Sequence, residues 1–454
     1  MEQKPGVAMI AAGFGSADLA EVFPEKKTFR ETCEVRIFYL QSDEGLRTVW
    51  AVLDFMDFDL KTVAGLKQAI MAELQLDRSH IHIVTTHNHG SATCDAIDLP
   101  RLASLSAAAA REAAANAVPA LIRSSRTRLE GQHNYIRRTV IPEAGGSATC
   151  FYGPAAENRF DSAPFAEHYL HALRDGQHVY TGFEPTARPF APFAPGDPEL
   201  FAMEFIAADR RPLGSLIRFS AHAVCCNDPA YYSSDYPFHV RKTFSRLSGG
   251  TAVFLNGPCA EIAPGMESKK SGMEKRLGEL LAQTAWKSLE NQSFEPLEHA
   301  ADLTETVSLP VRPEVLENRI GPLPEQLPAD LPARKRYLEQ LALRNTLPFL
   351  QAKYRSGEER VSDTITVELG LLRLNNVRIL AFPGETFNAT AAAAASGWPG
   401  TVTITEHGRT VMYIAPEAEF RQGGYESICA VTAPPAEEIL CRAAEDLLAR
   451  TSIP

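Results

Sequence analysis

The sequence lacks several features that would each point to a particular class of protein. No stretch reaches the roughly 18 uninterrupted apolar residues that a membrane-spanning helix needs, so we expect no membrane span. Basic residues number 45 against 56 acidic ones, which gives a net charge of -11. The chain therefore lacks the basic excess that binding to nucleic-acid phosphates or to an anionic membrane surface requires.

The cysteines show no pairing pattern, and we expect no export signal. The eight cysteines are scattered and form no C-x-x-C pair. Phe14 and nearby glycines interrupt the short N-terminal stretch of small residues, which leaves it without the apolar core of a secretory signal. Both features are typical of thiols in a reducing cytosol, and we expect a cytoplasmic protein. The alternative is a trimmed secreted protein with disulfides.

The chain has ample material for a large core, because 45% of its 454 residues are hydrophobic and 22% are charged. Length alone would suggest two or three domains, but large α/β enzymes exceed that figure as one unit. We predict a single large catalytic domain over residues 1–454. Residues 145–197 have little periodicity and are expected to form a lid or wall of a site. Residues 309–332, with six prolines, are expected to wrap the surface.

Strand and helix patterns alternate along the chain, which favours an α/β fold with a layered mixed β-sheet flanked by helices. Strands are expected at 34–41, 47–54, 81–89, 200–208, 214–222, 251–256, 364–374, 377–382 and 402–405. Helices are expected at 58–76, 102–122, 238–247, 272–288, 333–354 and 435–450.

The most informative stretch is the apolar run that begins at Ile81 and ends on His87, Asn88 and His89. In an extended segment side chains alternate between faces, so His87 and His89 are expected to project from the same side of a strand end. Neutral imidazole is the commonest protein ligand of zinc. A pattern this short also fits polar residues that merely close a strand.

Three further strands end in a similar way. The strand at 214–222 ends on His222, a Pro-Gly turn after the strand at 377–382 leads to Glu385, and the strand at 251–256 ends on Asn256. Reactive groups gather where such strand ends meet, and histidines with one carboxylate are the usual ligands of a catalytic zinc. A lone histidine in this position is more often a hydrogen-bonded structural residue, and Glu385 alone would suit a helix N-terminus. The other nine histidines are not expected to bind metal.

The order and spelling of these pieces resemble the catalytic domain of the neutral/alkaline ceramidases. The family's Thr-His-Thr-His turn is similar to residues 86–89, and its lone-histidine strand with the following helix start is similar to 219–222 and 233–237. Its Gly-Asp-Val-Ser-Pro block resembles 254–264, its Pro-Gly-Glu turn matches 383–385, and its final Tyr-Glu stretch resembles 413–426. The resemblance runs from about residue 8 to residue 430.

This resemblance implies a zinc ion held by His87, His222, Glu385 and Tyr413. It further implies that His89 shuttles the proton to the departing amine and that Tyr425 stabilises the oxyanion. Zinc would activate a water molecule and polarise the carbonyl of an amide bond. The expected substrate is a small molecule or an N-acyl lipid, while the oligomeric state stays open.

One departure from the family pattern restricts the mechanism. Many family members carry a serine, proposed as a nucleophile, where this chain has Ala263. An acyl-serine route at that position is excluded, which leaves metal-activated water, and ceramide becomes a doubtful physiological substrate. Two alternatives stay open: a zinc esterase or deacetylase acting on a small metabolite, and a catalytically silent relative that binds a ligand.

Overall fold

Two main β-sheets lie face to face in the computed structural model, which describes residues 10–24, 27–150, 169–177, 194–226, 228, 230–265, 272–355 and 362–451. Among these residues the larger sheet has nine strands and the smaller one has four. Each sheet contains both parallel and antiparallel pairs. The predicted α/β class with a layered mixed sheet is therefore confirmed.

The larger sheet takes its strands from the first two-thirds of the chain. In spatial order they are β13 (Thr251–Asn256), β11 (Pro212–Phe219), β10 (Glu199–Ala207), β6 (Val118–Arg128), β1 (Ile10–Asp18), β3 (Glu34–Ser42), β4 (Arg47–Leu53) and β5 (Ile81–Thr85), while β15 (Glu295–Pro296) pairs with β6. The smaller sheet has the order β16 (Ala300–Pro310), β17 (Thr364–Leu374), β18 (Val377–Ala381) and β20 (Thr401–Ile404).

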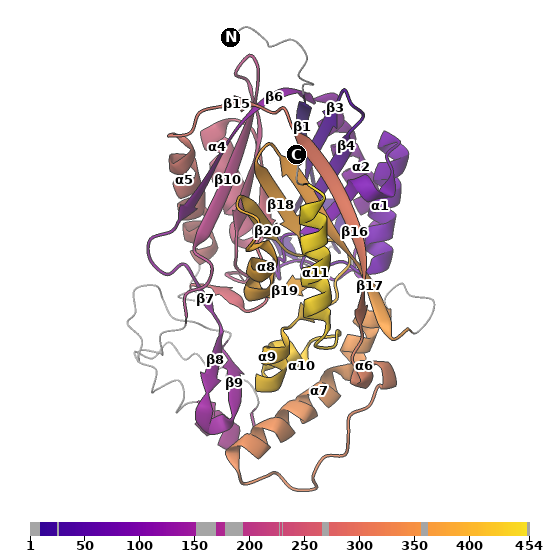
Figure 1. Cartoon of the computed structure of the whole chain (residues 1–454), viewed down its shortest axis with the longest axis vertical. Helices are drawn as coiled ribbons and strands as arrows, with labels where there is room; N and C mark the ends of the chain where they lie inside the picture. The colour runs from indigo at the N-terminus through magenta and orange to yellow at the C-terminus, as the bar shows by residue number, and fades with distance from the viewer. Residues whose placement is uncertain are drawn as a thin grey trace.

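Helices cover the outer face of each sheet. Those against the larger sheet are α1 (Leu60–Leu74), α2 (Leu99–Ala115), α4 (Asp235–Ser248) and α5 (Met273–Leu289). Those against the smaller sheet are α8 (Asn388–Ala395) and α11 (Ala436–Ala449), the latter lying in front of it in Figure 1. The result is a four-layer sandwich of helices, sheet, sheet and helices.

Shorter elements gather mainly beyond one end of the sandwich, around the long helix α7 (Leu331–Arg355), as Figure 1 shows. The helical ones are α6 (Pro313–Glu317), α9 (Glu417–Gln422) and α10 (Tyr425–Ile428), with 3-10 turns at Ala20–Val22, Arg78–His80 and Pro142–Ala144. The short strands are β2 (Thr28–Phe29), β7 (Asn134–Ile136), β8 (Arg138–Ile141), β9 (Gly146–Thr149), β12 (Tyr231–Tyr232), β14 (Ile262–Pro264), β19 (Glu385–Thr386) and β21 (Tyr413–Ile414).

Side-chain alternation along the strands builds the core between the layers. In β3, Phe38 and Leu40 point toward the smaller sheet, whereas Ile37 and Tyr39 point toward the helices. Leu372 of β17 joins Phe38 in the layer between the two sheets. Because both faces of these strands are buried, each sheet is held in register by two apolar layers at once.

The sequence analysis was wrong about the helix at 102–122. Helix α2 ends at Ala115, and the chain then forms β6, which pairs along nine residues with β10. Strand β1, which the sequence analysis did not predict, explains the alanine-rich helix. A Cβ at Gly13 or Gly15 would lie within 2.2 Å of a backbone oxygen of α2, so the two glycines let this helix pack directly on the strand.

The other predicted elements appear with ends shifted by a few residues, among them the strands β3, β4, β17 and β18 and the helices α1, α5, α7 and α11. The proline-rich stretch contains the end of β16 and all of α6, and its residues 318–330 are mostly exposed. Most of the predicted lid at 145–197 lies outside the described residues. All eight cysteines are thiols and none forms a disulfide, as predicted.

None of the helices that the structure describes combines the length and apolar character that a membrane crossing requires.

A buried ion pair joins the two sheets. Asp302 of β16 lies 2.9 Å from Nε2 of His82 and 2.9 Å from Nδ1 of His80, and it accepts a hydrogen bond from the Trp50 indole. Burial opposes ionisation of Asp302, but His82 and His80 outweigh it and hold the pKa of this carboxyl below its usual range. The carboxylate therefore contributes stability above pH about 4, which is lost as the pH falls further.

We expect Asp302→Asn to lower the free energy of unfolding at pH 7 by about 3 kcal/mol, because it removes the buried carboxylate that His82, His80 and the Trp50 indole share. The control Glu305→Gln, on the same strand, breaks an exposed pair with Arg450 and should cost less than about 1 kcal/mol. Urea unfolding of both variants measures the difference. Equal values would contradict a structural role for the ion pair between the sheets.

Candidate metal centre

The predicted site residues follow strands whose carboxyl ends meet at one edge of the sandwich. His87 comes two residues after β5, His222 three residues after β11, and Glu385 four residues after β18. A backbone hydrogen bond joins the first two of these segments, since the His89 amide donates to Ala223 O at 3.2 Å. The His222 amide donates to Ile262 O of β14 at 3.1 Å. The expectation that strand ends from distant parts of the chain converge is thus met.

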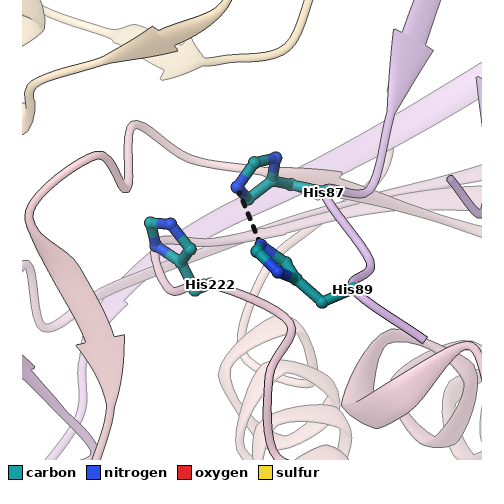
Figure 2. Close-up of side chains that lie close together, drawn as sticks. All are labelled: His87, His89 and His222. Carbon is teal, nitrogen blue, oxygen red and sulfur yellow. Dashed lines mark hydrogen bonds between the residues drawn. The ribbon is translucent and has the colours of Figure 1, made fainter. Parts of the chain in front are cut away.

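The segment with the two histidines is a turn, not the strand end that the sequence analysis expected. Strand β5 stops at Thr85, and His87 has a φ of 55°, in the left-handed region. Alternation of side chains therefore does not apply here, and that argument for a shared face was wrong. The turn itself brings the rings together, with Nε2 of His87 and Nε2 of His89 3.3 Å apart (Figure 2).

Each of two imidazoles is fixed in one tautomer by a backbone carbonyl. Nδ1 of His87 donates to Met56 O at 3.1 Å, and Nδ1 of His222 donates to Ile262 O at 3.0 Å. In a neutral ring the remaining nitrogen, Nε2, then carries a lone pair. The fixed Nδ1–H groups thus turn both lone pairs away from the backbone.

The carboxylate of Glu385 lies close to both of these nitrogens. Its Oε2 lies 3.3 Å from Nε2 of His87 and 3.1 Å from Nε2 of His222. The carboxyl group is buried, and its segment β19 pairs in parallel with β21. Nitrogen lone pairs that face a carboxylate oxygen at this distance repel one another unless a proton or another cation lies between them.

The donor atoms fit a zinc ion. With zinc–ligand bonds of about 2.0–2.1 Å, neighbouring ligands of a tetrahedral site lie about 3.3–3.4 Å apart. The two separations given above between proposed ligands, His87 to Glu385 and His222 to Glu385, are 3.3 and 3.1 Å. One nitrogen of each of the three histidines lies within 4.8 Å of the others, and Figure 2 shows the three side chains close together.

The pKa shifts of the histidines in the ion-free protein are consistent with a cation at this point. Burial lowers the pKa of His222 to about 4, helped by the charge of Arg137, so this ring is neutral at pH 7. Burial together with His87 and His222 holds the pKa of His89 well below its usual value. Burial opposes the charged form of His87 as well, but Glu406 and Glu385 outweigh it and raise the pKa to about 9.

A proton on His87 therefore takes the place of a cation beside Glu385, whose own pKa is held well below its usual range because His87 and His222 outweigh its burial.

Arg137, an arginine that the sequence analysis missed, connects Tyr413 to these residues. Nη2 of Arg137 donates to the Tyr413 hydroxyl at 3.0 Å, while Nη1 lies 3.3 Å from Nε2 of His222. The phenol oxygen thus faces the same side of the centre as His222. Tyr413 is also the β-sheet partner of Glu385. No sequence signal marked Arg137, because it belongs to the short strand connections rather than to an apolar strand end.

Tyr425 borders the same group. Its ring centroid is 5.8 Å from that of Tyr413, and burial raises the pKa of its hydroxyl, which therefore stays protonated at neutral pH. The neighbouring Glu426 binds two arginines, accepting from Arg137 at 2.8 Å and from Arg138 at 2.7 Å. Glu426 thereby anchors the guanidinium that holds Tyr413.

Ala263, where the resemblance led us to look for a serine, is buried in β14 and pairs with Tyr135. Glu261 of the same block accepts the Asn388 amide at 3.0 Å at the start of α8, a structural role. A second group of possible ligands, Glu31, His239 and Glu274, also lies within 4.8 Å. There the Arg30 guanidinium already sits 2.6 Å from Glu274 and supplies the positive charge.

Similarity to known proteins is found among solved structures. No protein-family model matches the chain, and no match was found among curated proteins. Solved structures do match, and they share the layered α/β architecture around a mixed sheet described above. They are neutral ceramidase structures.

The neutral ceramidase from Pseudomonas aeruginosa is similar with a TM-score of 0.64 and 14% identity, over 99% of this chain and 76% of that one. A ceramidase complexed with C2 gives a TM-score of 0.65, again at 14% identity and with the same coverage. The chain therefore has the neutral ceramidase fold, as the resemblance implied.

We expect Glu426→Gln to lower the free energy of unfolding by about 3 kcal/mol, because it leaves two buried arginines short of a counter-charge. Arg137 and Arg138 outweigh the burial of Glu426 and lower its pKa, so the loss relative to wild type should fade as the pH drops below about 4. Glu417→Gln, in an exposed pair with Arg421, is the control and should cost little. Urea unfolding at pH 7 and pH 3.5 tests both statements; a loss that grows in acid would refute the charge argument.

Proposed function

We propose that the protein is a zinc-dependent hydrolase that cleaves an amide bond in an N-acyl substrate. The observation that carries this proposal is the pair of fixed imidazoles whose Nε2 atoms face one oxygen of Glu385, at tetrahedral spacing. The neutral ceramidase fold supports it, since amide hydrolysis is what the name of those enzymes describes.

In this proposal His87, His222 and Glu385 hold the metal, with Tyr413 as the fourth ligand. A bound zinc ion would lower the pKa of a water molecule toward neutrality and polarise the scissile carbonyl. Arg137 donates to the Tyr413 hydroxyl beside His222. Burial and Glu385 raise the pKa of this hydroxyl, so the charge of a bound zinc ion, together with that of Arg137, would be needed to favour a deprotonated phenol oxygen there. With Ala263 in place of a serine, an acyl-serine route at that position is excluded.

The remaining residues handle the proton and the developing charge. His89 is neutral, so its Nε2 can accept a proton from the attacking water and pass it to the departing amine. Tyr425 stays protonated and can donate its hydroxyl hydrogen to the carbonyl oxygen as that oxygen becomes negative. Burial of the centre strengthens both interactions, because little water is present to screen them.

The first test is metal analysis of the wild type beside His87→Ala and His222→Ala, with His299→Ala, an exposed histidine, as the control. We expect about one zinc per wild-type chain and per control chain. Each of the two site variants should bind zinc at least about 100-fold more weakly, because a ligand matters more than the second-shell partners whose loss costs 10–100-fold.

The same proteins are then assayed on N-acyl substrates of different chain length, ceramide included, beside acetylated small amines and esters. Hydrolysis of N-acyl amides that follows the zinc content supports the proposal. Preference for acetyl groups or esters would favour the esterase or deacetylase alternative. A wild type that contains zinc and cleaves nothing in the panel would make it a ligand-binding relative.

Substitutions of Tyr425 and Tyr413 should have different effects on catalysis and on zinc binding. Tyr425→Phe should lower kcat by about 100-fold or more at unchanged zinc content, because it removes one donor to the oxyanion. Tyr413→Phe should weaken zinc binding itself. The measurements are steady-state kinetics and chelator competition on both variants. Loss of zinc from Tyr425→Phe with full retention by Tyr413→Phe would reverse the assignment.

A further inference from the structure

Two consecutive glycines, Gly423 and Gly424, form the turn that leads into Tyr425. Their φ angles are 72° and 103°, both in the region that favours glycine. A Cβ at Gly423 would collide with the carboxylate of Glu339, which belongs to α7. The absence of a side chain at this glycine therefore lets the carboxylate lie directly against the backbone of the turn.

The Glu339 carboxylate binds this backbone. Its Oε1 accepts the Gly424 amide at 2.7 Å and also accepts Nζ of Lys335, one helical turn earlier on α7, at 2.7 Å. Nζ of Lys335 donates in addition to Gln422 O at 2.8 Å. The side chains of Lys335 and Glu339 are 3% and 12% exposed, so little water competes for these charge-assisted bonds. One turn of α7 thus holds the chain on both sides of Gly423.

Glu339 is the contact whose effect on the turn can be isolated. Arg138 and Thr149 also bind the turn, and both donate to Glu426 as well. Substituting either of them would therefore disturb the charged network around Glu426 described above. Within the described part of the chain, the hydrogen bonds of Glu339 go to Lys335 and to the turn. A change at Glu339 thus acts on the turn and leaves that network in place.

We propose that Glu339 is a positioning residue for Tyr425. The inference rests on the proposed function, in which the Tyr425 hydroxyl stabilises the oxyanion. Such a donor must lie within about 3 Å of the oxygen that it stabilises. Tyr425 is the first residue of α10, so the turn before it sets where its side chain starts. A helix of four residues has little stability of its own, and the contact with the 25-residue helix α7 fixes the turn.

The first test is the kcat of Glu339→Ala and Glu339→Gln on an N-acyl amide that the wild type cleaves. Alanine removes the acceptor of the Gly424 amide, whereas glutamine keeps an oxygen there. We expect Glu339→Ala to lower kcat by about 10-fold, because a misplacement of roughly 1 Å can cost up to about 100-fold. KM and zinc content should change little, and Glu339→Gln should retain most of the wild-type kcat. Gln340→Ala, an exposed neighbour on α7, is the control.

A double-mutant cycle separates positioning from a general loss of folded enzyme. If Glu339 acts through Tyr425, Glu339→Ala should lower the kcat of the wild type but not the residual kcat of Tyr425→Phe. An equal fall in both backgrounds would overturn the inference while the proposed function stands. A wild-type kcat in Glu339→Ala would have the same consequence.

Hydrogen exchange gives a second readout that needs no substrate. We expect the amides of residues 420–428 to exchange faster in Glu339→Ala than in the wild type or Gln340→Ala, because the Gly424 amide loses its partner. Unchanged exchange would overturn the positioning role alone. A wild type that contains zinc but cleaves nothing would overturn the proposed function, and with it the catalytic role of the turn, whatever the exchange shows.

Discussion

The packing of the two sheets against each other is the constraint on which the rest of the structure depends. The layer of apolar side chains between them fixes the position of one sheet relative to the other. The contact between His82 and Asp302 adds a polar interaction between the sheets. Residues that follow β5 and β11 on one sheet thereby meet residues that follow β18 and β20 on the other. No single segment contains the centre; the stacking creates it.

Charge balance is the second organising feature of this region. Two arginines, two tyrosines and several carboxylates are buried together, and both arginines and Glu385 have a defined partner. Arg137 and Arg138 share Glu426, whereas Glu385 faces imidazole nitrogens that a carbonyl has already fixed. The proton on His87 balances Glu385 in the ion-free protein, and the proposal places a metal ion at the same point.

Much of the fold could be predicted from the sequence, because strands buried on both faces and amphipathic helices leave clear patterns. The hairpin of β17 and β18 and the helices α1 and α5 are examples. Strand β1 could not be found, since its alanines and glycines resemble a loop until α2 is known to pack on it. Likewise, the alanine pattern of α2 continued into β6, where pairing with β10 outweighs helix propensity.

The site was predictable in part for a similar reason. His87, His222 and Glu385 stand out because each follows an apolar strand and offers a metal-binding atom. Their meeting point depends on sheet stacking, and the turn at His87 depends on a left-handed residue that no local pattern announces. Arg137 has no sequence signal at all, because its importance comes from its burial beside His222, Tyr413 and Glu426.

X-ray absorption at the zinc edge of the metal-loaded protein tests the central claim most directly. The account predicts a first shell of only nitrogen and oxygen at about 2.0–2.1 Å, with the outer-shell scattering of at least two imidazoles. A sulfur ligand at about 2.3 Å would place the metal on cysteine, and a shell without imidazole would place it on carboxylates elsewhere. Either result would contradict a metal centre formed where the strand ends of the two sheets meet.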